Sequence, residues 1–222
     1  MKEEIVIPDK TFDIELEKDL LLENEKIAGQ NRELLKEKRV KSIEIMGSIG
    51  SGKTTLIEQL SKRLNKKYKI AVFNGDLTTA IDAERVKKHD VKVVQINTGR
   101  ECHLDADLIR KALQKVDLNA LDLLIVENVG NLICPAEFPL GCEKRVVVIS
   151  VTEGPYMVVK HPFIFSGADV VVINKKDLAR KMKVSVKKLE SDVKKINHRV
   201  KVIAANCRKG EGVAKVIRAL EL

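Results

Sequence analysis

The sequence is poor in aromatic residues and has no long apolar run. Of its 222 residues, two are Tyr, five are Phe and none is Trp. So few rings leave little capacity for stacking on bases, which argues against an RNA-binding protein. The longest apolar runs, such as 146–149, have the length of a strand and fall far short of the roughly 20 residues that a membrane helix needs. We therefore expect no nucleic acid and no membrane among the partners.

The sequence also lacks a secretory signal and contains little cysteine. The first residues, MKEEIVIPDK, have no apolar targeting core. Four cysteines fit a reducing compartment, where a thiol is usually buried, reactive or metal-bound rather than bridged. The chain is 44% apolar, which excludes collagen-like and disordered classes. These features predict a cytoplasmic protein with one domain, or one domain and a short appendage.

The formal net charge is +9, and the excess lies at one end of the chain. Residues 178–222 hold 13 of the 41 Lys and Arg but 4 of the 32 Asp and Glu, so residues 1–177 hold 28 of each sign. A charge of this size invites a nucleic-acid or acidic-membrane interpretation. However, the basic residues alternate with Val, Leu and Ile, as on solvated helix faces. We interpret the segment as a basic helical surface that serves solubility or docks an acidic protein.

The pattern of the sequence changes near residue 39. Residues 13–39 contain no Pro and carry apolar residues near helical spacing among many charges. They predict one long amphipathic helix, with Gly29 as a candidate break. We therefore divide the chain into a helical segment, residues 1–39, and a main domain, residues 40–222.

The main domain consists of short Val- and Ile-rich runs separated by helical patterns. The runs predict about seven strands, at 42–46, 69–73, 91–96, 121–126, 145–151, 169–173 and 201–204. Runs such as LDLLIV and DVVVIN are apolar throughout, as in strands buried on both faces. The predicted fold class is therefore α/β, a mostly parallel sheet with helices on both faces.

A phosphate-binding loop follows the first predicted strand. The segment GSIGSGKTT, residues 47–55, matches G-x-x-x-x-G-K-S/T, and a helical pattern follows at once. The glycines let backbone N–H groups face an anion, Lys53 reaches the β- and γ-phosphates, and Thr54 offers a hydroxyl to Mg2+. The predicted nucleotide ligands in this loop are Gly47, Ser48, Gly50, Ser51, Gly52, Lys53, Thr54 and Thr55. The main domain is therefore predicted to have the P-loop NTPase fold.

Two acids follow buried strands at the edge where the nucleotide would bind. In open parallel sheets the ligand lies at the carboxyl ends of the strands. Asp76 ends the second predicted strand and Glu127 ends the fourth, so both can face Mg2+ or its water shell. With Lys53 and Thr54 they form the predicted catalytic set. Gly130, three residues after Glu127, has the spacing of a segment that swings toward a γ-phosphate.

The sixth predicted strand ends in a guanine-recognition motif. In NKKD, residues 174–177, Asp177 can accept the N1 and N2 hydrogens of guanine, which adenine does not offer. Lys175 can cover the base with its stem, and Asn174 opens the motif. In NCRKGEG, residues 206–212, Asn206 and Cys207 replace the Ser and Ala that G proteins carry there, where the contact usually comes from a backbone N–H. GTP is therefore the predicted nucleotide.

Cys102, His103 and Cys134 form a separate chemical set. Cys102 and His103 are adjacent in TGRECHLDA, and Cys134 comes seven residues after Glu127. Thiolate and imidazole bind Zn2+ or Ni2+ rather than Mg2+. From the residues alone, a buried thiol beside a surface histidine is the commoner explanation, and three ligands fall short of a closed tetrahedral site. A two-fold dimer would bring two such sets together.

Several segments together resemble the HypB family, SIMIBI-class P-loop GTPases that insert nickel during hydrogenase maturation. They are GSIGSGKTTL, GD followed by DAERV, TGRECHLDA, ENVGNLICPAEF, SVTEG and NKKDLA, and the resemblance runs from about Val40 to the C-terminus. It implies that Cys102, His103 and Cys134 bind Ni2+ or Zn2+ at a GTP-dependent homodimer interface. It also implies other hydrogenase maturation proteins and a hydrogenase large-subunit precursor as partners. The Cys- or His-rich nickel motif of some members is absent from residues 1–40.

The leading hypothesis is therefore a Mg2+-dependent GTPase and metallochaperone for nickel-iron hydrogenase. Its GTP binding, hydrolysis and dimerisation would be coupled to nickel delivery, through a shift of the segment from Glu127 to Gly130. No glutamine follows Gly130, so no residue is assigned to orient the attacking water, and we expect slow turnover. The alternatives are a urease-type nickel GTPase like UreG, an RNA-associated GTPase, and a metal sensor whose nucleotide never turns over.

Overall fold

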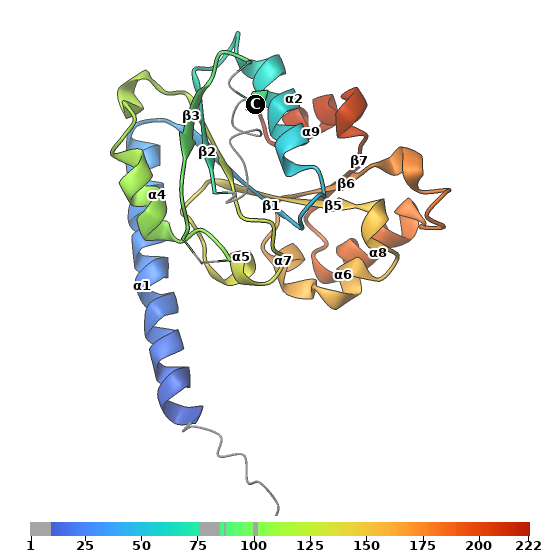
Figure 1. Ribbon diagram of the computed structural model, residues 1–222, viewed down its shortest axis with the longest axis horizontal. Coiled ribbons are helices and arrows are strands. Elements are labelled where there is room, and N and C mark those ends of the chain that lie inside the picture. The colour runs from blue at the N-terminus through green and yellow to red at the C-terminus, as the bar shows by residue number, and fades with distance from the viewer. Residues whose placement is uncertain (1–9, 76–84, 87, 100–101) are drawn as a thin grey trace, which may run out of the picture.

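A computed structural model describes residues 10–75, 85–86, 88–99 and 102–222, the first eight of them as backbone alone (Figure 1). At its centre lies a seven-stranded sheet in the order β3-β2-β4-β1-β5-β6-β7, and every neighbouring pair of strands is parallel. The strands are β1 (Lys41–Gly47), β2 (Ile70–Asn74), β3 (Lys92–Gln95), β4 (Leu123–Glu127), β5 (Lys144–Ser150), β6 (Val170–Asn174) and β7 (Lys201–Ala204). Each predicted strand overlaps one of these, so the predicted α/β fold is confirmed.

Helices cover both faces of the sheet (Figure 1). On one face, α2 and α9 pack on the side chains of Ile43 and Ile45. On the other face, α1 and α4 cover the β2–β4 half around Phe73, while α6, α7 and α8 cover the β5–β6 half around Val147. The helices are α1 (Lys10–Glu37), α2 (Lys53–Leu64), α4 (Ala106–Leu113), α5 (Cys134–Glu137), α6 (Met157–Lys160), α7 (Pro162–Ser166), α8 (Val186–Ile196) and α9 (Val213–Ala219). Short 3-10 turns lie at η1 (Leu118–Ala120), η2 (Val151–Glu153), η3 (Lys176–Leu178) and η4 (Cys207–Lys209).

The long N-terminal helix is confirmed as α1, and it runs through Gly29 without the break that we considered. Its buried stripe begins at Asn24 and reaches Leu35 at near-heptad spacing, with Asn31 between them. Leu20, one of the apolar residues near helical spacing, is 60% exposed. The described side chains of α1 thus pack only from about Asn24 onward. The division of the chain at residues 39 and 40 stays a prediction.

Two buried asparagines fasten α1 to the domain. The Asn24 side chain accepts a hydrogen bond from the Ala106 N–H at 2.8 Å and donates to the Pro139 carbonyl at 3.0 Å. The Asn31 amide donates to the Ala106 carbonyl at 2.8 Å and to the Leu140 carbonyl at 3.1 Å. Each asparagine therefore connects the start of α4 to the loop before β5. We call this pair the α1 clamp.

The parallel strands bring four chain segments to one edge of the sheet. β1, β4, β5 and β6 are consecutive neighbours, and their carboxyl ends are Gly47, Glu127, Ser150 and Asn174. The loops that follow these ends are therefore adjacent, which is the arrangement that places ligands in open α/β sheets. Among the described residues, no helix has the length and apolarity that crossing a membrane requires.

Candidate functional site

The phosphate-binding loop has backbone angles that glycine alone adopts easily. Gly47, Gly50 and Gly52 have φ values of 150°, 73° and 103°. A Cβ atom on Gly47 would lie 2.2 Å from the Val148 carbonyl oxygen, and one on Gly52 would lie 2.2 Å from Asn174 Nδ2. The loop is thus pressed against β5 and β6, and α2 begins directly after Gly52. This geometry suits the backbone anion site that the sequence predicts.

Lys53 is buried at the first position of α2 and folds back over the loop. Its ammonium group donates to the carbonyl oxygens of Gly47 and Ser48, both at 3.2 Å. Ser51 is buried and Thr55 is half-buried in the same turn. The amine therefore lies at the mouth of the loop, where phosphate oxygens can replace the two carbonyls as its partners.

Thr54 and Glu127 meet at the predicted magnesium position. The Thr54 hydroxyl donates to Glu127 Oε1 at 2.7 Å, and β1 and β4 are in register there, with Ile45 opposite Glu127. A hydroxyl and a carboxylate are oxygen donors of the kind that Mg2+ binds, usually beside several waters. The donor set therefore fits the ion. Asp76, the other predicted acid, lies outside the described residues.

The base-recognition motif holds three loops together. Asn174 donates from Nδ2 to the Ser51 carbonyl at 2.8 Å and accepts at Oδ1 from the Cys207 N–H at 3.0 Å. Lys175 has a φ of 56° and donates from Nζ to the Gly50 carbonyl at 2.8 Å. The motif is thus joined directly to the phosphate loop.

The remaining base contacts lie beside this junction. Asp177 is exposed in η3, and Asn206 Oδ1 accepts the Lys209 N–H at 3.2 Å. The Cys207 N–H, a group expected to contact guanine, is already hydrogen-bonded to Asn174. Cys207 is fully buried, and burial raises the pKa of its thiol to about 12, in keeping with a packing role. The guanine contacts themselves stay predictions.

Glu153 is a site residue that the sequence did not single out. It ends η2, directly after β5, and its carboxylate accepts the Ser150 N–H at 2.7 Å. Burial raises the pKa of Glu153, and the positive charges of Lys175 and Lys53 oppose that rise. The carboxylate therefore belongs to the surroundings of the phosphate loop. The sequence signal that could have identified Glu153 was an acid three residues after β5, a strand that neighbours β1.

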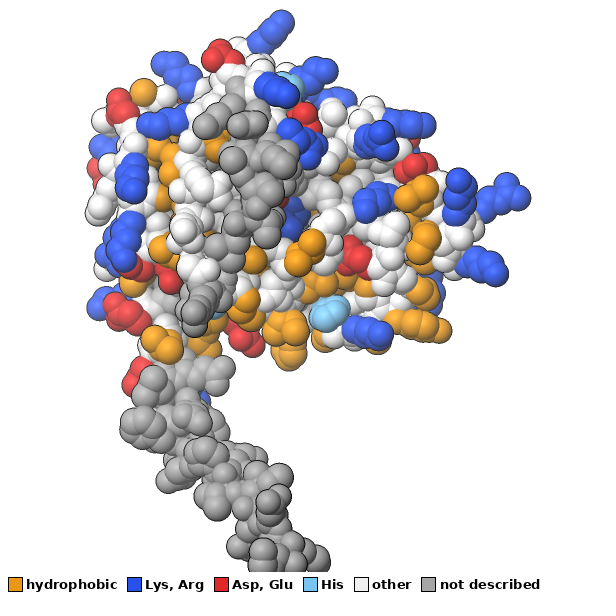
Figure 2. Space-filling view, viewed as in Figure 1, with side chains coloured by type: hydrophobic (Ala, Val, Ile, Leu, Met, Phe, Trp, Pro, Cys, Tyr) orange, Lys and Arg blue, Asp and Glu red, His pale blue; other side chains and the backbone are white. Residues whose placement is uncertain are grey.

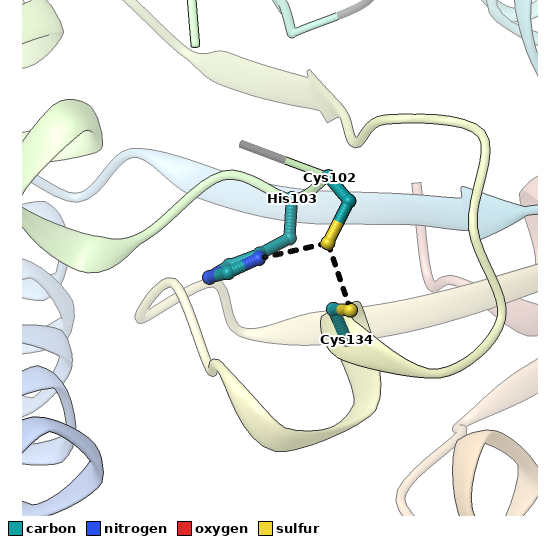
Figure 3. Close-up of side chains that lie close together, drawn as sticks. All are labelled: Cys102, His103 and Cys134. Carbon is teal, nitrogen blue, oxygen red and sulfur yellow. Dashed lines mark hydrogen bonds between the residues drawn. The ribbon is translucent and has the colours of Figure 1, made fainter. Parts of the chain in front are cut away.

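Cys102, His103 and Cys134 converge on one point (Figure 3). Their ligand atoms all lie within 4.8 Å of one another, the only such group of three that the described ranges contain. The Cys102 thiol donates to Cys134 Sγ at 2.9 Å, and Cys102 Sγ lies 3.7 Å from His103 Nδ1. The His103 ring packs on Phe138 with the ring centres 4.0 Å apart. The arrangement offers two sulfurs and one nitrogen, a set suited to Zn2+ or Ni2+.

Cys134 influences the ionisation of the Cys102 thiol. The hydrogen bond with Cys134 raises the pKa of Cys102, and partial burial and the charge of Cys134 raise it further. A divalent cation would remove this conflict, because it binds both sulfurs as thiolates and releases their protons.

One short segment connects this cluster to the nucleotide site. We call residues 127–134 the linking segment, because it begins at Glu127 and ends at Cys134. Gly130 packs on the phosphate loop so closely that a Cβ atom there would lie 2.5 Å from the Ile49 side chain. Asn131 forms a backbone bridge with Gly47. The linking segment therefore touches the phosphate loop at two further points after Glu127.

The same segment holds the cysteine that comes from the other loop. Asn131 donates from Nδ2 to the Cys102 carbonyl at 3.3 Å and accepts at Oδ1 from the Ile133 N–H at 2.9 Å. A single side chain thus fixes the backbone of Cys102 beside the residue that precedes Cys134. The sequence predicted that Cys134 would respond to movement at Glu127, but it did not predict the role of Asn131.

Comparison with known proteins identifies the family of the chain. A family model described as CobW/HypB/UreG, nucleotide-binding domain, matches residues 41–204. The chain is 50% identical over 208 residues to the probable hydrogenase maturation factor HypB of Methanocaldococcus jannaschii, and the match covers 94% of each protein. The chain belongs to the CobW/HypB/UreG family. The HypB of Escherichia coli K12 is 36% identical over 94% of this chain and 72% of its own length.

Solved structures of CobW/HypB/UreG family members have the same fold. The crystal structure of HypB from Archaeoglobus fulgidus superposes with a TM-score of 0.85 at 46% identity, over 90% of this chain and 98% of the other. HypB from Helicobacter pylori, solved in complex with nickel, gives 0.78 at 34% identity over 90% of each chain. A LAO/AO transport system kinase, at 16% identity and a TM-score of 0.56, shares the fold alone.

Cys142 and the other histidines lie outside the cluster among the described residues. Cys142 is buried, and burial strongly raises the pKa of its thiol. His89 lies beside α2, with its Nε2 atom 3.6 Å from Glu58 Oε1. His161 and His198 belong to no group of three possible ligands among the residues described. The predicted ligand set thus comprises the three residues that the fold brings together, and their role as ligands stays a prediction.

Proposed function

We propose that this protein is a Mg2+-dependent GTPase that delivers nickel during the maturation of nickel-iron hydrogenase. The observation that carries the proposal is the convergence of Cys102, His103 and Cys134 at the end of a segment that begins at Glu127. Membership of the CobW/HypB/UreG family and the similarity to hydrogenase maturation factors support the same function. Nickel is cargo here, and Zn2+ is a second ion that the same ligand set accepts.

The chain's own residues perform most of the nucleotide chemistry by positioning. Lys53 exchanges its bonds to the Gly47 and Ser48 carbonyls for the β- and γ-phosphate oxygens of GTP. Thr54 and Glu127 would hold Mg2+, with Asp76 as a further proposed ligand, directly or through water. When bound, the ion would neutralise the charge that develops on the phosphates. Asn174, Lys175 and Asp177 select guanine.

The contacts of the linking segment support a coupling of nickel release to the nucleotide state. Opening the Thr54–Glu127 hydrogen bond moves the start of this segment, and contacts with Gly47 and Ile49 transmit any change in the phosphate loop. Asn131 passes the movement to the Cys102 backbone, and Cys134 lies at the far end of the same segment. The nucleotide state therefore sets the separation of the metal ligands.

A second copy of the chain completes the metal site. Three ligands leave a tetrahedral ion open, and a two-fold axis near Cys102 would place two sets together. The surface beside the cluster is suited to such a contact, since Ile133, Tyr156, Val159 and Phe163 are all at least 60% exposed. Figure 2 shows hydrophobic side chains gathered along the lower edge, where Figure 1 places α5 to α7. We assign this face to a GTP-dependent homodimer, whose further partners are maturation proteins and the hydrogenase precursor.

A urease-related role is the second candidate. The HypB proteins of Helicobacter hepaticus and Helicobacter pylori, 36% and 38% identical to this chain, are named hydrogenase/urease maturation factors. The Cys-His-Cys set suits nickel delivery to either enzyme. Restoration of hydrogenase but not urease activity in strains that lack the corresponding factor would separate the two.

Replacing Lys53 tests the enzymatic part of the proposal. In Lys53→Ala, phosphate release from GTP should fall about 10²- to 10³-fold, because a charged donor to the transferred phosphoryl group is lost. Lys66→Ala removes an exposed lysine near the end of α2 and should leave the rate unchanged. Equal rates in the wild type and Lys53→Ala would show that this loop does not perform the hydrolysis.

A further inference from the structure

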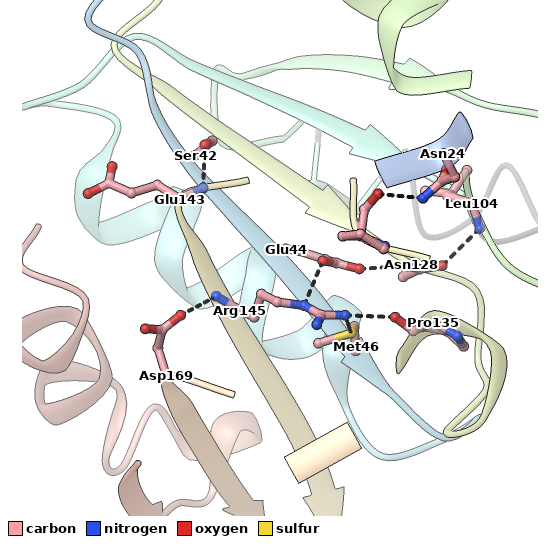
Figure 4. A network of polar contacts seen from close by, with 11 residues as sticks. Asn24, Ser42, Glu44, Met46, Leu104, Asn128, Pro135, Glu143, Arg145 and Asp169 are labelled. Atoms are coloured by element: carbon pink, nitrogen blue, oxygen red, sulfur yellow. Dashed lines mark hydrogen bonds and ion pairs between the residues drawn. The ribbon is translucent and has the colours of Figure 1, made fainter. Parts of the chain in front are cut away.

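A buried polar network lies between the two chain segments that carry the metal ligands (Figure 4). Its centre is Glu44 of β1. Asn128 donates from Nδ2 to Glu44 Oε1 at 2.8 Å, and Arg145 donates from Nε to Glu44 Oε2 at 3.2 Å. Both carboxylate oxygens are therefore engaged, one by the residue directly after β4 and the other by a residue of β5, the two strands that flank β1.

Each arm of the network ends on the backbone beside a ligand. Asn128 Oδ1 accepts the N–H of Leu104 at 3.0 Å, and Leu104 directly follows His103. At the other end, Arg145 donates from Nη2 to the carbonyl of Pro135 at 2.7 Å, and Pro135 directly follows Cys134. Glu44 thus joins, through one side chain on each side, two segments that are about thirty residues apart in sequence.

The position of Glu44 is costly for a charged group. Glu44 lies in the central strand between the buried residues Ile43 and Ile45, and it is itself only 1% exposed. Burying a carboxylate in such a place is unfavourable unless a partner charge and further hydrogen bonds compensate. Arg145, whose side chain is 21% exposed, supplies the charge. A pair of apolar residues would fill this space at lower cost, so the network suggests a role beyond packing.

We propose that Glu44, Asn128 and Arg145 are positioning residues for the metal site, which they hold at the separation that its ion requires. This inference rests on the metal-binding part of the proposed function. The outer hydrogen-bond partners of metal sites orient the ligands and set affinity. Here the network orients backbone segments rather than ligand side chains. Asn128 also directly follows Glu127, so the network shares a strand end with the magnesium position.

The test measures Co2+ binding to the full-length protein, since Co2+ reports ligand type and geometry in its absorption spectrum. Arg145→Lys keeps the buried charge pair, but a single ammonium group cannot bond Glu44 and the Pro135 carbonyl as the guanidinium fork does. Glu44→Gln keeps the shape and removes the charge. We expect both variants to bind Co2+ about 10- to 100-fold more weakly. At saturating Co2+, their sulfur-to-metal and d–d bands should be weakened and shifted.

Two controls separate positioning from general destabilisation. Ser42 lies on the same face of β1 as Glu44, two residues before it. Ser42→Ala removes the acceptor of a hydrogen bond from the Glu143 N–H, which is not in a segment that carries a proposed metal ligand. It should keep the wild-type Co2+ affinity and spectrum even where its melting temperature falls. Cys102→Ala, which leaves Cys134 as the one remaining sulfur of the set, should bind Co2+ more weakly and lose intensity in the sulfur-to-metal band.

The outcomes distinguish the positioning role of the network from metal binding by the cluster itself. Wild-type spectra and affinity in Arg145→Lys and Glu44→Gln, with loss in Cys102→Ala, would overturn the positioning role and leave the metal site standing. An unchanged Co2+ spectrum in Cys102→Ala would overturn both. If Glu44→Gln does not fold, Arg145→Lys alone tests the positioning role, because this variant keeps a positive charge beside Glu44.

Discussion

Asn174 shows how one residue of a recognition motif can serve the architecture of the site. Its amide joins the phosphate loop at Ser51 to the 206–212 loop at Cys207. It also lies so close to Gly52 that no side chain fits there. The sequence predicted that these positions bind one nucleotide, and the structure adds that they support one another. An exchange at Asn174 would disturb the phosphate loop as well as the base site, so Asp177 gives the cleaner test of base selection.

Replacing Asp177 should weaken guanine binding selectively. Asp177→Asn removes a charged acceptor for the N1 and N2 hydrogens of guanine, which costs about 1.5–3 kcal/mol, or roughly 10- to 100-fold in affinity. Adenine makes no such bond, so the weaker affinity for ATP should not change. Competition against a fluorescent GDP analogue measures both, with Glu190→Gln on the exposed side of α8 as the control. Equal losses for GTP and ATP would contradict base recognition at Asp177.

At the scale of elements, α1 is the helix whose contacts with the domain could not be predicted from the sequence. Its apolar residues predicted a helix correctly, but pattern analysis cannot tell which polar residues face the domain. The α1 clamp, Asn24 and Asn31, connects the start of α4 to the 139–140 backbone. These two segments continue from the loops that carry the proposed metal ligands. The described part of α1 therefore supports the face on which we propose that metal binds.

Removing one half of the α1 clamp should destabilise the protein. Asn31→Ala leaves the Ala106 and Leu140 carbonyls buried without the amide that bonds both, and we expect a loss of about 2 kcal/mol in the free energy of unfolding. Urea denaturation with an unchanged slope measures this. Glu33→Ala, at an exposed position of the same helix, should stay within about 0.5 kcal/mol of the wild type. Equal midpoints for the two variants would show that the clamp contributes nothing.

The strands were the most predictable elements, and the polar network was the least. Valine-rich runs buried on both faces identify parallel strands whatever their partners are. Glu44 interrupts such a run, and its role depends on Arg145 of β5 and on Asn128, which directly follows β4. Strand order is a property of the whole sheet, so a local sequence pattern cannot predict which side chains contact Glu44. The phosphate loop was predictable for the opposite reason, because one contiguous segment carries the whole motif.

For the whole molecule, the metal cluster depends on topology. Cys102 and Cys134 are 32 positions apart, and they meet because the loops after β3 and β4 leave the same edge of the sheet. Residue chemistry alone left a packing role open, and the resemblance to a family suggested the pairing. The distances now support it. Asp76, by contrast, lies outside the described residues, so its part in the magnesium site rests on the sequence.

The charge of the molecule is divided in the same way as its functions. Residues 1–177 carry equal numbers of both signs and contain the proposed phosphate, magnesium and metal ligands. The excess of +9 lies on residues 178–222, which form α8, β7, η4 and α9. Apart from the predicted base contacts at Asn206 and Cys207, we interpret this basic surface as a docking or solubility feature.

The central claim is that the nucleotide state controls the metal site, and one titration tests it directly. Ni2+ binding and molecular size are measured together, first with GDP and then with a non-hydrolysable GTP analogue, on the wild type and on Cys102→Ala. In the wild type, we expect the analogue to increase the dimer fraction and to change Ni2+ affinity about 5- to 150-fold, which is the usual range for coupled binding sites. Cys102→Ala should lose this response. Ni2+ affinity, stoichiometry and size that ignore both the nucleotide and the substitution would contradict it.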